Sequence, residues 1–233
     1  MHSAIKIGFA SIGFLILSWT WSACKKNRYQ DIPALAERFS YFPLNPGNTY
    51  TYKLNRITFD AFNNQSDTVN WLIKDVHDTF FIDNLGRNAL RVFRYLNRSN
   101  SLNQPWDTTY AYYIVQDEGH LEMVYNNRRD VIFSLPIAEG ITWNTHVFNE
   151  QDEHWVFFDM SQSELIVQDH KFSNCVQVRS LPGPYFNPNI SRIDIYAPNL
   201  GLVKREYNHV VNRSGRPQGI KDQLEIIEYE IKP

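Results

Sequence analysis

Seven histidines are the side chains of this sequence best suited to bind metal or to transfer protons near neutral pH. They are scattered, because no H-E-x-x-H, no H-x-H and no paired cysteines give them the spacing of a metal site. On a strand, alternate residues share a face, so Asp75 can pair with His77 and Asp152 with His154. These pairs are otherwise typical of the solvated polar edges of strands and turns. The sequence therefore predicts neither a metal site nor a cofactor.

Motifs for nucleophilic catalysis and for phosphate binding are absent from the sequence. No G-x-S-x-G elbow is present, and the ten glycines are scattered rather than grouped in a phosphate-binding loop. Lys and Arg number 23 against 25 Asp and Glu, without the basic excess that nucleic-acid binding requires. We therefore expect no nucleic-acid partner. A glycosidase needs only two carboxylates about 5–10 Å apart, so that class stays open.

Aromatic residues are abundant and make up 15% of the 233 residues. They can line a cavity for a lipid or a sugar inside a curved sheet, or they can fill a closed core, which is their more usual place. Tyr185 and Phe186 differ, because they lie in a proline-rich loop, where large apolar side chains often mark a contact surface. The candidate ligand or partner contacts are Tyr185, Phe186, Trp155 and Trp143.

The first 23 residues have the pattern of a signal peptide. Lys6 precedes an uncharged apolar run, residues 7–17, which suits a signal-peptide core and is short for a membrane span. Ser22-Ala23-Cys24 then places two small residues before a cysteine, and this resembles the lipobox of bacterial lipoproteins. The resemblance implies cleavage before Cys24, whose sulfur is then linked to diacylglycerol and anchors the chain to membrane lipid. Two alternatives stay open, ordinary cleavage after Cys24 and an uncleaved apolar anchor.

The two cysteines therefore have separate predicted roles. Once Cys24 carries lipid, Cys175 has no partner for a disulfide bond within the chain. Cys175 lies in a strand-like context without a neighbouring base or positive charge, so we expect a buried thiol rather than a nucleophile.

The rest of the chain divides into a polar tether, residues 24–40, and a single domain, residues 41–233. In the domain, apolar and polar residues alternate over short stretches, which predicts β-strands. Residues 108–115 are apolar on both faces, as in a central strand. We count about eleven strands and no helical pattern of about twelve residues. The sequence predicts an all-β fold with a single curved antiparallel sheet, which is a meander, an open barrel-like sheet or a sandwich.

Turn residues separate the predicted strands. Hairpin turns are predicted where Asp, Asn and Gly cluster, at residues 83–86, 117–119 and 126–127. Residues 181–191 and 212–219 contain proline and glycine and are predicted to be loops. Residues 42–50 are echoed by residues 133–143, because each segment has Phe-x-Leu, then a glycine and then an aromatic residue. The echo fits a duplicated half-sheet or a coincidence equally well.

Two motifs in the domain resemble one family. Residues 41–52 read YFPLNPGNTYTY and resemble the F-P-L-x-x-G-N-x-W-x-Y opening of many uncharacterised bacterial envelope lipoproteins. Residues 196–206 read YAPNLGLVKRE and are similar to their Y-A-P-G-V-G-L-V-K segment, with Asn199 in place of a glycine. Asn tolerates a positive φ, so the turn is still expected to form. The resemblance implies a secreted, curved antiparallel sheet and carries over no catalytic residue.

Three functions fit these observations. The first is a lipid-anchored binding or accessory module of the bacterial envelope, which holds an apolar ligand or docks an envelope protein. The second is a hydrolase that acts on envelope glycans through carboxylates, with His154 as a candidate partner. The third is a purely structural lipoprotein. We prefer the first, because the anchor and the aromatic residues are present and a catalytic motif is not. It places the protein at the outer membrane, facing the periplasm or the cell surface.

Overall fold

The computed structural model describes residues 40–150, 152–161, 163–181 and 189–232, all of which belong to one compact unit, Pro33–Pro233. This part of the chain consists of strands and turns and contains no α-helix. Within it, no helix is long and apolar enough to cross a membrane. The predicted signal peptide and nearly all of the predicted tether lie outside the described residues.

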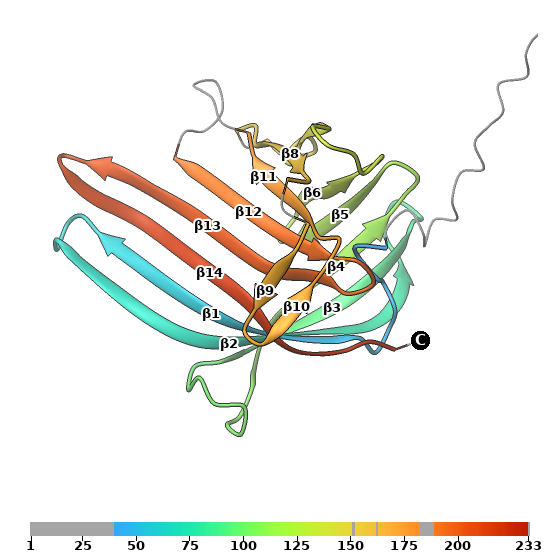
Figure 1. Ribbon diagram of the computed structural model, residues 1–233, viewed down its shortest axis with the longest axis horizontal. Coiled ribbons are helices and arrows are strands. Elements are labelled where there is room, and N and C mark those ends of the chain that lie inside the picture. Colours follow the sequence, from blue (N-terminus) through green and yellow to red (C-terminus); the bar gives the residue numbers. More distant parts are fainter. Residues whose placement is uncertain (1–39, 151, 162, 182–188, 233) are drawn as a thin grey trace, which may run out of the picture. The chain divides into compact units, whose positions relative to one another are not determined.

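The described residues form fourteen strands, namely β1 (Thr49–Asp60), β2 (Gln65–Ile82), β3 (Asn88–Asn97), β4 (Asp107–Gln116), β5 (His120–Tyr125), β6 (Arg128–Ser134), β7 (Thr142–Asn144), β8 (Trp155–Asp159), β9 (Leu165–Val167), β10 (His170–Phe172), β11 (Val176–Ser180), β12 (Ile190–Ala197), β13 (Gly201–Arg213) and β14 (Arg216–Glu230). Twelve of them form one curved antiparallel sheet in the order β6-β5-β4-β3-β2-β1-β14-β13-β12-β11-β8-β7 (Figure 1). The first and last strands of the domain therefore pair at the centre of the sheet. β9 and β10 form a separate two-stranded sheet.

The predicted all-β class and the single curved antiparallel sheet are confirmed. The strand count of about eleven is close, and the difference has a simple origin. β7, β9 and β10 have three residues each, which is too short for an alternating pattern to be recognised. Residues 108–115 lie in β4, which has a paired neighbour on each side, as the apolar pattern predicts.

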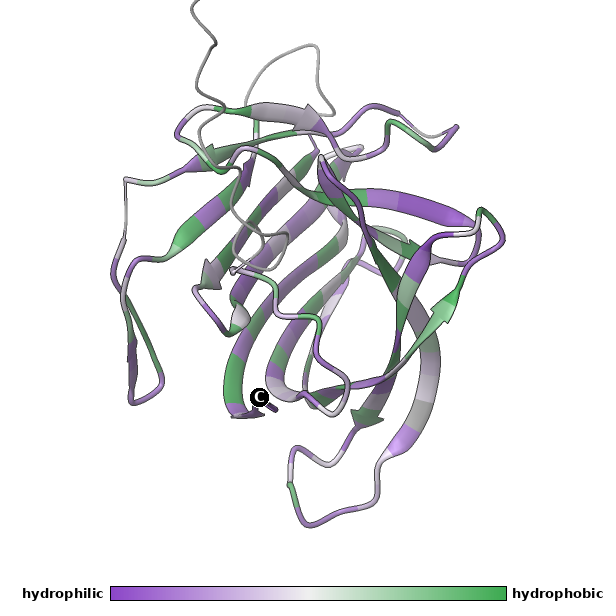
Figure 2. Ribbon diagram, turned by 90° about the vertical axis from the view of Figure 1, so that its right-hand side faces the viewer, coloured by the Kyte–Doolittle hydropathy of each residue, from purple (hydrophilic) through white to green (hydrophobic). Residues whose placement is uncertain are grey.

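Alternating side chains explain why the long strands form. In β1, Tyr50, Tyr52 and Leu54 are buried on one face, and in β3 the same is true of Leu90 and Val92. Bands of hydrophobic and hydrophilic residues accordingly follow one another along the strands (Figure 2). β1 and β14 are joined along eleven paired positions, which makes this central pair one of the most extensive in the sheet.

The predicted hairpin turns are confirmed by the backbone. Asn126 and Asn127 connect β5 to β6 with φ angles of 48° and 61°, the left-handed conformation that Asn tolerates. Asn199 has a φ of 59°, so this residue does replace the glycine of the resembling motif without loss of the turn. The predicted loop at residues 181–191 falls largely outside the described residues.

The predicted loop at residues 212–219 is wrong. β13 and β14 are joined by a two-residue turn, in which Ser214 and Gly215 have φ angles of 52° and 81°. Pro217 lies inside β14 opposite Asn212, and it is tolerated because the pairing of β14 with β1 begins only at Gly219. The missing amide of the proline therefore leaves no hydrogen bond unmade on the β1 side.

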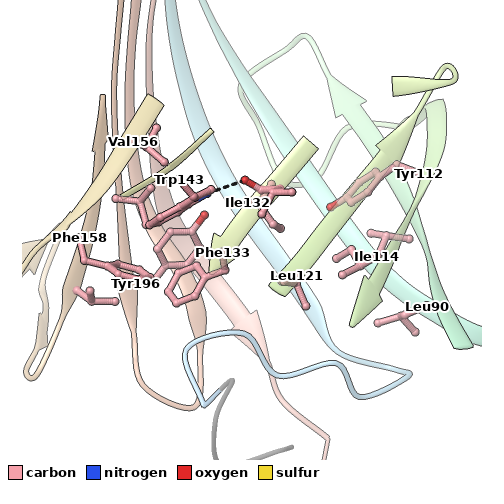
Figure 3. Close-up of a cluster of buried hydrophobic side chains, with 14 residues drawn as sticks. Leu90, Tyr112, Ile114, Leu121, Ile132, Phe133, Trp143, Val156, Phe158 and Tyr196 are labelled. Atoms are coloured by element: carbon pink, nitrogen blue, oxygen red, sulfur yellow. Dashed lines mark hydrogen bonds between the residues drawn. The ribbon is translucent and has the colours of Figure 1, made fainter. Parts of the chain in front are cut away.

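The two outermost strands of the sheet, β6 and β7, approach each other and bring the sheet close to a closed ring. The amide of Val131 donates a hydrogen bond to the carbonyl of Thr145, just after β7 (2.8 Å). The indole Nε1 of Trp143 donates to the carbonyl of Val131 (3.0 Å), as the dashed line in Figure 3 shows. The side chain of Asn149 continues this seam, because its amide group accepts from the backbone N–H of Arg129 and donates to its carbonyl.

The larger of two hydrophobic clusters lies inside the curved sheet and is rich in aromatic rings (Figure 3). The ring centres of Trp143 and Phe158 are 4.7 Å apart, and Phe133 lies 5.0 Å from both Phe158 and Tyr196. Separations of this size are typical of attractive aromatic pairs in cores. Part of the aromatic excess of the sequence is therefore structural.

The second cluster joins the central strands to the small sheet. Val167 of β9 and Phe172 of β10 pack with Ile195 of β12 and with Cys175. Cys175 is 4% exposed, which confirms the prediction of a buried thiol, and burial raises its pKa.

Candidate ligand site inside the sheet

A cavity of about 100 Å³ lies among the inward-facing side chains of the sheet. Its wall combines aromatic and aliphatic groups with two arginines, Arg94 of β3 and Arg205 of β13, and Phe42 and Pro43 line it from the segment before β1. Sites for drug-sized ligands measure about 300–1,000 Å³. The cavity therefore suits a compact chemical group rather than a long acyl chain.

The first charged network of the wall is built across β2 and β3. Asp75 and Arg94 are directly opposite in the strand register, so their side chains meet on the same face. The guanidinium binds the carboxylate at two points, from Nε to Oδ1 and from Nη2 to Oδ2, both at 2.6 Å. Arg94 Nη1 also donates to the hydroxyl of Tyr110 (3.0 Å), and the hydroxyl of Tyr112 donates to Asp75 Oδ2 (3.1 Å).

The second network repeats this arrangement across β12 and β13. Asp194 and Arg205 are directly opposite, and the guanidinium binds the carboxylate at 2.6 and 2.7 Å. Arg192 and the hydroxyl of Tyr196 donate to the same carboxylate. Burial alone would raise the pKa of Asp194, but the charges of Arg192 and Arg205 and their hydrogen bonds hold that pKa well below its ordinary value. The carboxylate is therefore ionised at neutral pH.

The two networks leave positive charge and donor capacity unused. Three arginines, Arg94, Arg192 and Arg205, face two carboxylates, so the formal charge of the networks is +1. Among the described residues, no acceptor forms a hydrogen bond with Nη1 of Arg205. Burial alone would lower the pKa of Arg205, but the nearby carboxylate raises it, so the guanidinium stays charged. The wall can thus bind an anionic oxygen at the mouth or inside the cavity.

The two predicted Asp-x-His pairs have different surroundings. Asp75 and His77 do share a face, and both line the cavity. His154 is buried as well, but its ring contacts two hydroxyl groups, one of them Ser180 Oγ (2.9 Å), whereas Asp152 is exposed. The expectation of solvated edges is wrong for Asp75, His77 and His154, because all three are buried: Asp75 and His77 face the cavity from β2, and His154 packs against hydroxyl groups just before β8.

Burial keeps His77 neutral. The side chain is 4% exposed and lies against the ring of Tyr50, with ring centres 5.2 Å apart. Burial lowers the pKa of His77 from 6.5 to about 4, although the charge of Asp75 and a hydrogen bond with the backbone of Asn45 act in the opposite direction. His77 therefore contributes no charge to the cavity at neutral pH.

Trp143 and Trp155, the two predicted contact residues that the structure describes, are not among the residues that line this cavity. Trp143 is buried in the aromatic core beside β8. Trp155 is half-buried on β8, and its indole Nε1 donates to a neighbouring carboxylate at 2.9 Å. Cys24, Tyr185 and Phe186 lie outside the described residues. The aromatic residues that do line the cavity are mainly tyrosines, from β1, β4, β5 and β12.

A second cluster of chemically capable groups lies near the turn before β5. Asp117, His120 and Glu122 bring potential metal ligands within 4.8 Å of one another. Glu122 is 1% exposed, however, and its oxygens accept hydrogen bonds from Arg87, Arg129 and His120. A metal ion would have to displace two guanidinium groups and would meet their positive charge. The cluster is therefore an ion-pair network rather than a metal centre.

Sequence reasoning alone missed the two arginines that line the cavity, Arg94 and Arg205, and Asp194, which binds Arg205. Asp194 stands between two isoleucines, and a charged residue in such a run is a weak sign of a buried ion pair. The sign becomes specific only when the strand opposite is known, because the register of β12 and β13 selects Arg205 as its partner. No local pattern in the sequence contains that register.

The sequence and the structure were compared with those of known proteins. No protein family matches the sequence, and no curated protein matches it. A protein of Bacteroides fragilis NCTC 9343, described as exported and as having a YmcC-like fold, is 11% identical over 82% of this chain and 98% of its own, with a TM-score of 0.45. A protein of Parabacteroides distasonis ATCC 8503 described as a lipoprotein is 12% identical over the same shares, with a TM-score of 0.40. LprF from Mycobacterium bovis is 7% identical over 84% of this chain and 90% of its own, with a TM-score of 0.25. At these identities and TM-scores, the comparisons assign neither a family nor a function to this chain.

Proposed function

We propose that this chain is a lipid-anchored protein of the bacterial envelope and that its β domain binds a compact anionic ligand. The observation that carries the binding role is the unused Nη1 group of Arg205, a residue that lines the cavity, beside two networks whose formal charge is +1. The anchor is Cys24, and the protein is held at the outer membrane, facing the periplasm or the cell surface. Its role there is that of a binding or accessory module.

The amino-acid sequence of the leader supports the anchor. A basic residue, an eleven-residue apolar run and Ser22-Ala23-Cys24 follow one another at the distances of a lipoprotein leader. Two or three acyl chains give stable attachment, whereas one chain binds a membrane only marginally. Lys25, Lys26 and Arg28 follow Cys24 directly and would attract anionic lipid headgroups.

The lining of the cavity supports the class of ligand. A guanidinium group binds carboxylate or phosphate oxygens through charge-assisted hydrogen bonds, which are about twice as strong as neutral ones. Apart from Asp75, His77 and Arg94, the remaining wall is mainly aromatic and aliphatic, so it favours a short apolar part beside the anionic group. A small carboxylate of a few carbon atoms satisfies both requirements and the volume.

A hydrolase acting through carboxylates receives less support. Such an enzyme needs one carboxyl group whose pKa is raised, so that it can donate a proton to the leaving group. Asp75 and Asp194 are the carboxylates of the two inward-facing networks, and each is bound at two points by an arginine. The pKa of Asp194 is lowered rather than raised, so this carboxyl group is a poor proton donor.

Calorimetric titration of the full-length chain with butyrate and with inorganic phosphate tests the binding role. We expect Arg205→Gln to weaken binding about tenfold or more, because a charge-assisted hydrogen bond is lost. Arg56→Gln is the matched control, since Arg56 binds Asp222 at two points with the same geometry but does not line the cavity. Arg205→Lys keeps the positive charge beside Asp194, and it replaces Arg205→Gln in the binding test if that variant does not fold. Equal affinity for the Arg205 variants and the control would contradict the proposal.

Metabolic labelling with radioactive palmitate tests the anchor. Label in the wild-type chain that disappears in Cys24→Ser supports acylation at this residue. Label that survives the substitution, or a wild-type chain without label, contradicts it. The two tests are independent, so a failure of ligand binding leaves the anchor standing.

A further inference from the structure

The last residues of β2 and the turn that leads to β3 carry a group of exposed apolar side chains. Phe80 and Phe81 are 42% and 37% exposed, and Ile82 and Leu85 reach 66% and 65%. We refer to these four residues as the β2–β3 tip. Exposed apolar groups gathered on one projection of a folded domain usually mark a contact with another apolar phase or partner.

The tip is held in place by the turn that carries it. Asp83 Oδ1 accepts hydrogen bonds from the amides of Leu85 and Arg87, both at 2.9 Å, and the backbone of Asp83 pairs with Gly86 and Arg87. The Arg87 guanidinium then neutralises the Asp83 carboxylate at 2.7 Å and also binds Glu122. The charges of the turn are thus paired internally. The apolar side chains are left projecting from a rigid support.

The described chain starts at the same end of the sheet. The amide of Gly47 donates to the carbonyl of His77 (2.7 Å), and the amide of His77 donates to the carbonyl of Asn48 (2.9 Å). The segment before β1 therefore lies against the last part of β2, and both occupy the right-hand end of the sheet in Figure 1. Ser40 is sixteen positions after Cys24, and a chain of this length reaches about 55 Å at most when fully extended.

We propose that the β2–β3 tip inserts into the bilayer that holds the anchor, so that this end of the sheet faces the membrane. The inference rests on the proposed acylation of Cys24. The segment from Cys24 to Ser40 joins the domain at the end that carries the tip. This attachment keeps the tip close to the membrane, which is therefore the apolar phase that these side chains meet most often. A projecting turn, unlike a groove, also fits a soft surface without a complementary shape.

Phe62 provides a matched control on the same strand pair. It is 90% exposed and lies in the turn between β1 and β2, at the other end of the 18-residue strand β2. A purely hydrophobic attraction without orientation would draw Phe62 to the membrane as strongly as Leu85. An orientation imposed by the tip and the attachment would keep Phe62 in water.

Fluorescence depth measurements on the full-length chain test the orientation. Leu85→Cys and Phe62→Cys, each in a Cys175→Ala background, carry an environment-sensitive fluorophore, and the protein is reconstituted in phosphatidylcholine–phosphatidylglycerol vesicles with spin-labelled lipids. We expect quenching of the Leu85 label at least about twofold stronger than that of the Phe62 label. Phe62→Cys reports the background in the same preparation.

The mass of the mature N-terminal peptide separates the two ways in which the inference can fail. If Cys24 is acylated and the Leu85 label is quenched no more than the Phe62 label, the orientation is wrong and the anchor stands. If Cys24 carries no lipid, the proposed anchor and the orientation are both overturned. A Leu85 label shielded from water but not quenched by lipid would point to a protein partner and would also overturn the orientation.

Discussion

Each carboxylate of the two cavity networks is held by an arginine from the neighbouring strand. Removing one member of a buried pair leaves the other charge uncompensated, which costs far more than the pair contributes. Asp194 is the clearest case, because it is fully buried and two guanidinium groups depend on it. Because each pair forms only when its two residues lie opposite each other, the networks favour the observed strand register near the cavity. They also set the charge of the cavity wall.

We expect Asp194→Asn to lower the free energy of unfolding by about 3–5 kcal/mol, because Arg192 and Arg205 lose their counter-charge. Asp107→Asn is the matched control, since Asp107 pairs with Arg98 where both side chains are more than half exposed. The control should lose about 1 kcal/mol or less. Urea unfolding measures both values, and similar losses in the two variants would show that the buried network is energetically unimportant.

Acid should destabilise the domain through His77. Its pKa is about 4 when folded and 6.5 ordinarily, so between these values the unfolded chain binds a proton that the folded chain does not. The contribution of His77 to the free energy of unfolding is fully present above pH 6.5. It falls by roughly 3 kcal/mol as the pH is lowered towards 4. His77→Leu should flatten the dependence of unfolding free energy on pH between 6.5 and 4. The wild-type chain measured in parallel is the reference, and an unaltered slope in His77→Leu would refute this assignment.

At the scale of elements, the seam between β6 and β7 depends on the side chain of Asn149, which forms the pair of hydrogen bonds that a neighbouring strand would otherwise form with the backbone of Arg129. Asn149 accepts from the amide of Arg129 at 2.8 Å and donates to its carbonyl at 2.9 Å. We expect Asn149→Ala to speed hydrogen exchange at the Arg129 amide about tenfold, because that amide loses its acceptor. Asn63→Ala is the control, since Asn63 bonds Asp60 in a distant turn. Unchanged exchange at Arg129 would show that the backbone closes the seam without Asn149.

Strands with a long alternating pattern could be predicted from the sequence, and so could turns built from Asn and Gly. The turn at Ser214 and Gly215 could not, because Pro217 nearby reads as a break in any local pattern. Only the sheet order shows that this proline lies beyond the end of β1, where no amide is required. The shortest strands were missed for a related reason, since three residues do not establish a period.

At the scale of the whole molecule, the topology decides what the sequence can reveal of the site. The cavity wall takes Arg94 from one half of the chain and Arg205 from the other. Their proximity depends on β1 and β14 pairing at the centre of the sheet, a contact between distant parts of the chain. The aromatic excess was visible in the composition, but its division between core and cavity wall follows from that pairing.

The central pairing of β1 with β14 also has a consequence for biosynthesis. Paired residues of these two strands are at least 160 positions apart, from Phe59 with Gly219 outward. A ribosome delivers the chain from its N-terminus, so one edge of β1 stays open until nearly all of the chain has emerged. During that interval the edge can pair with other extended chains, and slow long-range closure prolongs the exposure. The first strand of the domain to be made is thus among the last to acquire both of its neighbours.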